Sequence, residues 1–157
     1  MNELHTLFER FLSGNIPENE LLPGYNGMIA LPLSEVIDAK GFINCPAGVV
    51  ITSKGLWIAH LPFMDHVKDT ASLWNDLYDV EKIYGAYALG SNEDRLNYLT
   101  EAIKKKAKIT DVETSRLQPH ATGIYNLRIT QENKNIIIEF YETGAEDNKI
   151  SKRVLLD

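Results

Sequence analysis

The spacing of apolar residues predicts three amphipathic helices. In each segment the apolar side chains recur three and four positions apart, as they do along one face of an α-helix. Each segment also begins with residues whose side chains suit a helix N-terminus. The first helix is expected to follow Asn2 and to end before Gly14. The second helix is expected to follow Asp65 and to extend as far as Tyr78. The third is expected to open with the S-x-x-D pattern at Ser91 and to reach Ile103.

Alternating and β-branched residues predict strands elsewhere. The clearest pair is GVVITS and LWIAHL, over residues 48–53 and 56–61, with Lys54-Gly55 as the turn of a hairpin that places Val49 opposite His60. Further strands are expected over residues 82–89, 112–117, 123–130, 135–142 and 150–156. Residues 15–33, which are rich in Pro and Gly, are expected to form a connection with at most short extended pieces.

This order of elements predicts the fold class. A helix, a hairpin, a helix, a strand and a helix are followed by a run of strands, which is typical of an α+β protein with a mostly antiparallel sheet. We expect a layered sandwich with flanking helices. The chain has 157 residues, of which 44% are hydrophobic, and this length fits a single domain over residues 1–157.

The charge and composition of the chain limit the kinds of partner and the location that we expect for it. The net charge of −6 argues against nucleic acid, which needs a basic face. The lysine run at 104–106 is instead expected to end a helix. No segment approaches the roughly 18 apolar residues of a membrane span. A single Cys and the absence of a signal peptide favour a cytoplasmic location, or export by a route that leaves no such signal.

The single cysteine, Cys45, lies just before the hairpin that ends in His60, 15 residues further on. If Pro46, Ala47 and Gly48 form a turn, Cys45 folds back over the strand end that carries His60. If the strand runs straight instead, about four residues separate the two side chains, or ~13 Å. An adjacent imidazole would lower the thiol pKa from about 8.5 and make Cys45 a nucleophile.

The segment FINCPAGVVITSKGLWIAHL resembles a superfamily of glutamine deamidases. This superfamily includes the bacterial chemoreceptor deamidases (CheD), the cytotoxic necrotizing factor toxins and small fungal proteins. The shared pattern is a Cys after a Gly-containing turn, an apolar strand, a basic-Gly turn and a strand that ends in Ala-His. The matching residues are Gly41, Cys45, Ala47, Gly55, Ala59 and His60.

The resemblance implies a layered CheD-like fold and a Cys45–His60 pair that deamidates a glutamine of a protein substrate. We expect no cofactor and no metal. Asn44 stands where the superfamily commonly has Gly, and Pro46 supplies no backbone N–H to an oxyanion hole. The group that orients the histidine varies in the superfamily. By residue type, Asp38, Ser34 and Asp65 are candidates.

Three alternatives accompany this hypothesis. The chain could be a non-catalytic binding or regulatory domain in which Cys45 is only buried, because cysteine is among the most buried residue types. It could be a thiol peptidase or amidase, although the nucleophile of those enzymes normally begins a helix. It could bind zinc through His60, Asp65, His66 and His120, but their spacing matches no common metal motif.

Overall fold

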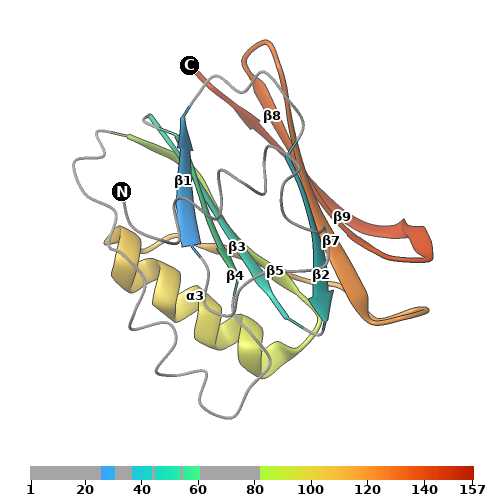
Figure 1. Cartoon of the computed structure of the whole chain (residues 1–157). Helices are drawn as coiled ribbons and strands as arrows, with labels where there is room; N and C mark the ends of the chain where they lie inside the picture. The colour runs from blue at the N-terminus through green and yellow to red at the C-terminus, as the bar shows by residue number, and fades with distance from the viewer. Residues whose placement is uncertain (1–25, 31–36, 44, 54, 61–81) are drawn as a thin grey trace.

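The computed structural model describes residues 26–30, 37–43, 45–53, 55–60 and 82–157 (Figure 1). The helices expected after Asn2 and after Asp65 lie outside these residues. The described part contains one helix and nine strands, and all paired strands are antiparallel except β5 and β6. The α+β class with mostly antiparallel sheets is therefore confirmed.

The strands form two sheets. The central sheet has the order β1 (Asn26–Ala30), β4 (Gly55–His60), β3 (Ala47–Thr52), β5 (Ile83–Gly90) and β6 (Glu113–Arg116). The outer sheet has the order β2 (Ile37–Ile43), β7 (Ile124–Glu132), β8 (Asn135–Glu142) and β9 (Ala145–Leu155). The helix, α3 (Glu93–Ala107), lies between β5 and β6 in the chain.

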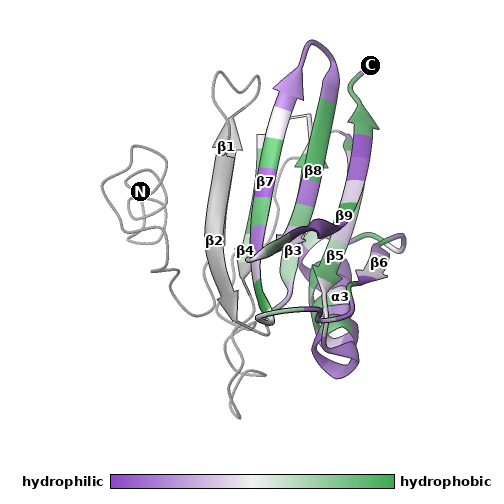
Figure 2. Cartoon of the chain, turned by 90° about the vertical axis from the view of Figure 1, so that its right-hand side faces the viewer, coloured by the Kyte–Doolittle hydropathy of each residue, from purple (hydrophilic) through white to green (hydrophobic). Residues whose placement is uncertain are grey.

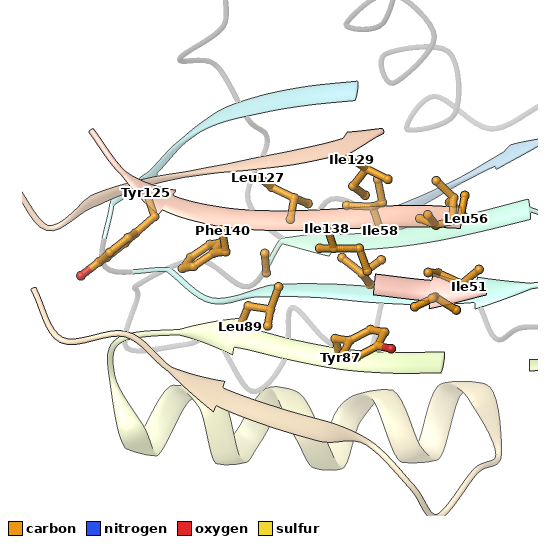
Figure 3. Packing of buried hydrophobic residues seen from close by; sticks show 14 of the residues in the cluster. Ile51, Leu56, Ile58, Tyr87, Leu89, Tyr125, Leu127, Ile129, Ile138 and Phe140 are labelled. Atoms are coloured by element: carbon orange, nitrogen blue, oxygen red, sulfur yellow. The ribbon is translucent and has the colours of Figure 1, made fainter. Parts of the chain in front are cut away.

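The helix, the central sheet and the outer sheet stack as three layers (Figure 1). Alternate residues of β3 face opposite layers, so all six of its residues are buried. One core lies between the two sheets, and its largest members include Ile51, Leu56, Leu89, Leu127 and Phe140 (Figure 3). A second core lies between α3 and the central sheet, with Val50, Trp57, Leu96, Leu99 and Ile103. In Figure 2, hydrophobic and hydrophilic bands alternate along β7 and β8, as expected when one sheet face is buried.

The ends of α3 follow helix-capping rules, with one change from the expected start. Asn92, and not Ser91, is the N-cap, because its Oδ1 accepts a hydrogen bond from the backbone N–H of Arg95 at 3.0 Å. Ser91 is instead buried. The lysines at 104–106 form the last turn, which confirms their predicted place at a helix C-terminus.

Both sheets contain strands that the hydrophobic pattern did not reveal. β1 falls within the expected connection, and β2 was not predicted because Asp38, Lys40 and Gly41 interrupt its apolar residues. A register shift between Lys40 and Phe42 also breaks its alternation. β9 begins five residues earlier than expected, because a tight connection with Gly144 at φ 81° returns the chain directly onto β8.

The β3–β4 hairpin has a different register from the predicted one. Ile51 pairs with Leu56, Val49 with Ile58, and Ala47 with His60. The Thr52 hydroxyl closes the hairpin, since it accepts from the N–H of Gly55 at 3.1 Å and donates to its carbonyl at 2.9 Å. Gly55 therefore begins β4 and does not belong to the turn. Because the shift amounts to two residues, every side chain keeps the face that alternation gives it.

Candidate functional site

Cys45 lies where the chain crosses from the outer sheet to the central sheet. β2 ends at Ile43, and β3 begins at Ala47. The Cys45 side chain is 7% exposed and belongs to the inter-sheet core, together with Leu117 and Tyr125. We call this end of the sandwich the crossover end.

Residues 46–48 do not form the turn that one of the two expected arrangements required. Ala47 and Gly48 are part of β3, and Gly48 pairs with Ala59 on one side and Ala88 on the other. The observed hairpin register nevertheless brings the two residues of the proposed pair closer together along the strand. It places His60 directly opposite Ala47, two residues from Cys45. That separation corresponds to ~7 Å of strand length, against the ~13 Å expected for a straight strand.

A close backbone contact fixes the position of Pro46. A Cβ atom added to Gly90 would lie 2.9 Å from the Pro46 Cβ and 3.1 Å from its Cα, so only glycine fits here. The carbonyl of Gly90 also accepts a hydrogen bond from the N–H of Leu117 at 2.7 Å. The next carbonyl, that of Ser91, accepts from Arg116 Nε at 2.8 Å. Pro46, the residue after Cys45, is thus packed against Gly90, in a segment that hydrogen bonds hold in place.

Replacing Gly90 with alanine should therefore disturb the crossover end. We expect Gly90→Ala to lower the free energy of unfolding by about 1–3 kcal/mol, because the Pro46 backbone must move to admit the methyl group. Urea unfolding measures this change.

Gly48→Ala is the matched control for this substitution. Its added Cβ would approach the Ile103 Cδ1 atom at 2.9 Å, and that atom ends a flexible side chain that can shift. A Gly48→Ala variant that is destabilised more than Gly90→Ala would contradict this account of the Pro46 contact.

Tyr125 from β7 occupies the crossover end of the inter-sheet core. Its ring stacks on Phe140, with centroids 5.1 Å apart and an interplanar angle of 16°. Its hydroxyl points away from both Phe140 and Leu127 (Figure 3). Burial raises the pKa of Tyr125, the nearby Ser91 hydroxyl partly offsets this effect, and the Glu142 carboxylate adds to it. Ser91 does not meet hydrogen-bond geometry, so the buried Tyr125 hydroxyl has no hydrogen-bond partner among the described residues.

Glu142 pairs with Tyr125 across β7 and β8 and is fully buried. Its two oxygens accept backbone N–H bonds from His120 (2.8 Å), Ala121 (2.9 Å) and Gly123 (2.8 Å), and a side-chain bond from Asn148 (3.0 Å). Burial alone would raise the pKa of Glu142, but these four hydrogen bonds outweigh it and lower the pKa from 4.5 to about 2. The ionised carboxylate therefore fixes the segment that leads into β7.

Of the other candidates for the site, the structure describes only Asp38. Asp38 is in β2 and pairs with Arg128, five residues before Ile43, or roughly 17 Å along the strand from the crossover end. Ser34, Asp65 and Asn44 lie outside the described residues. Sequence reasoning missed Tyr125 and Glu142. The sequence did contain an indication of Glu142. Ile136, Ile138 and Phe140 are alternate residues that face the core, and Glu142 is a charged residue at the next position of the same alternation.

Within the described residues, no group of three or more His, Cys, Asp or Glu side chains could hold a metal ion. His120, from the proposed zinc set, lines a surface hollow of about 570 Å³ with residues 144–148. No helix in the same part of the chain is long and apolar enough to cross a membrane. The chain matches no protein-family model, no curated protein and no solved structure.

Proposed function

We propose that this protein is a cysteine-dependent amidohydrolase that deamidates glutamine side chains of a protein substrate. The observation that carries the proposal is the register of the hairpin, in which His60 lies opposite Ala47 and two residues from the buried Cys45. Along β4, position 60 follows Leu56 and Ile58 at intervals of two residues, and both of those residues are in the inter-sheet core.

The reaction needs both residues. His60 takes the thiol proton, and the Cys45 thiolate attacks the carboxamide carbon to form a C–S bond. When the tetrahedral intermediate collapses, the C–N bond breaks and His60 returns the proton, so that ammonia leaves. Water activated by His60 then attacks the thioester, which breaks the C–S bond and releases glutamate and the thiol.

The finer fold assignment is part of the same proposal. The layered helix–sheet–sheet order and the position of Cys45 two residues before β3 support a relationship to the CheD and cytotoxic necrotizing factor superfamily. A cytoplasmic location, or export without a recognisable signal, goes with this proposal. Ser34 and Asp65 remain the proposed candidates for orienting His60, whereas Asp38 does not, because it lies five residues before Ile43 along β2.

The burial of Cys45 favours a second candidate function, a non-catalytic binding or regulatory domain. A thiol that is 7% exposed, among Leu117 and other core residues, could serve packing alone. Under this function the thiol reacts only after unfolding.

A direct test uses peptides that contain glutamine, incubated with the protein in water enriched in heavy oxygen. Deamidation converts the amide to an acid and introduces one heavy oxygen, which mass spectrometry detects at the modified residue. Peptides with asparagine in place of glutamine, and heat-unfolded protein, are the controls. Amides that stay intact across a broad peptide library and with folded protein substrates would contradict the proposed activity.

A further inference from the structure

A surface hollow lies where β5 and β6 diverge. It has a volume of about 410 Å³ and is lined by residues 85–87 of β5 and by residues 110–113, which lead into β6. The parallel pairing of the two strands begins only at Tyr87 and Glu113. Within the described part of the chain, the residues of β5 before Tyr87 therefore have no partner strand on this side, and the hollow occupies the space beside them.

The Tyr87 side chain lies between the inter-sheet core and this hollow. It is only 8% exposed and belongs to that core, yet it also lines the hollow. Its hydroxyl points away from Leu89 (Figure 3) and lies against Gly85, where an added Cβ atom would be 2.8 Å from the oxygen. Gly85 itself lines the hollow. The hydroxyl of a nearly buried ring is thus directed into the hollow.

None of the described residues forms a hydrogen bond with the Tyr87 hydroxyl. Burial raises the pKa of Tyr87, and the charge of the Glu113 carboxylate raises it further. A hydroxyl in such a position usually has a hydrogen-bond partner, and a phenylalanine would fill the core without needing one. All the residues that line the hollow are described, so none of its walls supplies the partner. A ligand in the hollow would supply it.

The charged side chains that line the hollow are both acidic. They are Asp111 and Glu113, and both residues are exposed. Glu113 Oε1 accepts a hydrogen bond from Lys152 of β9, which holds this carboxylate in place. Ala86 and Val112 add apolar surface to the hollow. Acceptor oxygens beside an apolar wall suit a cation that is carried on an alkyl chain.

We propose that this hollow binds a primary alkylammonium group, as carried by a lysine side chain or by a free diamine. An ammonium group has three N–H donors, which match the hydroxyl oxygen of Tyr87 and the carboxylates of Asp111 and Glu113. The alkyl chain would lie along Val112.

The hollow is separate from the proposed amidohydrolase site. Gly90, which contacts Pro46 at the crossover end, lies five residues after Gly85 on β5, or roughly 17 Å along the strand. The binding of an ammonium group therefore does not depend on the proposed reaction of Cys45, and the two proposals can be tested independently.

A titration followed by NMR of the backbone amides tests the proposal with one probe for each source of the ammonium group. The probes are 1,5-diaminopentane and Nα-acetyl-lysine amide, at pH 7. Their neutral counterparts are 1-pentanol and the Nε-acetylated form of the lysine probe. We expect both amines to shift the amide signals of residues 85–87 and 110–113, and the neutral compounds to bind at least about tenfold more weakly. Tighter binding of the lysine probe would indicate a peptide as the source, and tighter binding of the diamine a free amine.

Two substitutions test the assigned contacts. Tyr87→Phe removes only the hydroxyl and should weaken the binding of both amines by about tenfold. Asp111→Asn removes one charge and should weaken it by about threefold to tenfold. Tyr125→Phe is the matched control, because Tyr125 belongs to the same core but does not line this hollow. It should bind both amines like the wild type.

Three results would overturn the proposal. In the first, the neutral compounds bind as tightly as the amines. In the second, the amines cause no shifts at residues 85–87 and 110–113. In the third, Tyr87→Phe and Asp111→Asn both bind the amines like the wild type, while the spectra show that both variants are folded. None of these measurements involves deamidation, so failure here would leave the proposed function as it stands.

Discussion

Cys45→Ala is expected to abolish deamidation, with turnover lowered by roughly 10⁴–10⁶-fold, because no other residue can form the thioester. The substitution removes only a sulfur atom from the inter-sheet core. We therefore expect the free energy of unfolding to change by about 1 kcal/mol or less. Turnover is measured as ammonia release from the peptides that wild-type protein deamidates, and stability by urea unfolding.

Val154→Ala is the control for loss of packing. Val154 lies in the same inter-sheet core, on β9, and is 5% exposed. The variant should lose stability by about 1–3 kcal/mol and keep wild-type turnover. Activity retained by Cys45→Ala would exclude the thioester mechanism, and equal activity loss in both variants would indicate a general effect of core packing.

Glu142→Gln should lower the free energy of unfolding by about 2–4 kcal/mol at pH 7. The carboxylate accepts hydrogen bonds from three backbone N–H groups and from Asn148. A glutamine amide has one oxygen only, and its NH₂ group would face donors. At least one backbone N–H would therefore lose its partner while it stays buried.

The same substitution should change how stability depends on pH. The pKa of Glu142 is about 2 in the folded protein, against 4.5 for an unperturbed glutamate, so ionised Glu142 stabilises the fold fully above about pH 4.5. This contribution declines as the pH falls from about 4.5 and is lost below about 2. The stability difference between wild type and Glu142→Gln should therefore narrow over this window, as urea unfolding at several pH values would show.

Glu139→Gln provides a comparison on the same strand. Glu139 forms an ion pair with Lys149 at 2.9 Å, and both side chains are partly exposed. Its loss should cost less than about 1 kcal/mol, as is usual for surface pairs. If Glu142→Gln were no more destabilising than Glu139→Gln, the hydrogen-bonded carboxylate would not hold the crossover end together.

The hydrophobic pattern predicted much of the second half of the fold. The segments of β5, α3, β7 and β8 were expected within a few residues of their observed bounds, because each carries a regular apolar face that one neighbouring layer buries. The lysines at 104–106 likewise indicated the end of α3. The edge strands β1 and β2 were not predicted, because glycine and charged residues interrupt their alternation.

The candidate site was harder to predict, because it depends on pairing between distant segments. A local rule for two-residue turns placed Val49 opposite His60, whereas the Thr52 side chain sets a register two residues away. Tyr125 follows the ordinary inward pattern of a core strand. Only the contacts of the folded protein show that its hydroxyl lacks a partner among the described residues.

The pKa of the Cys45 thiol tests the central claim most directly. The rate of alkylation by iodoacetamide, measured against pH in wild type and in His60→Ala, reports the thiolate fraction in the folded protein. If His60 activates Cys45, the wild-type profile should give an apparent pKa well below the ordinary value of about 8.5, and His60→Ala should return it to that value or above. Identical profiles in the two proteins, or a thiol that is alkylated only after unfolding, would contradict the proposed nucleophile.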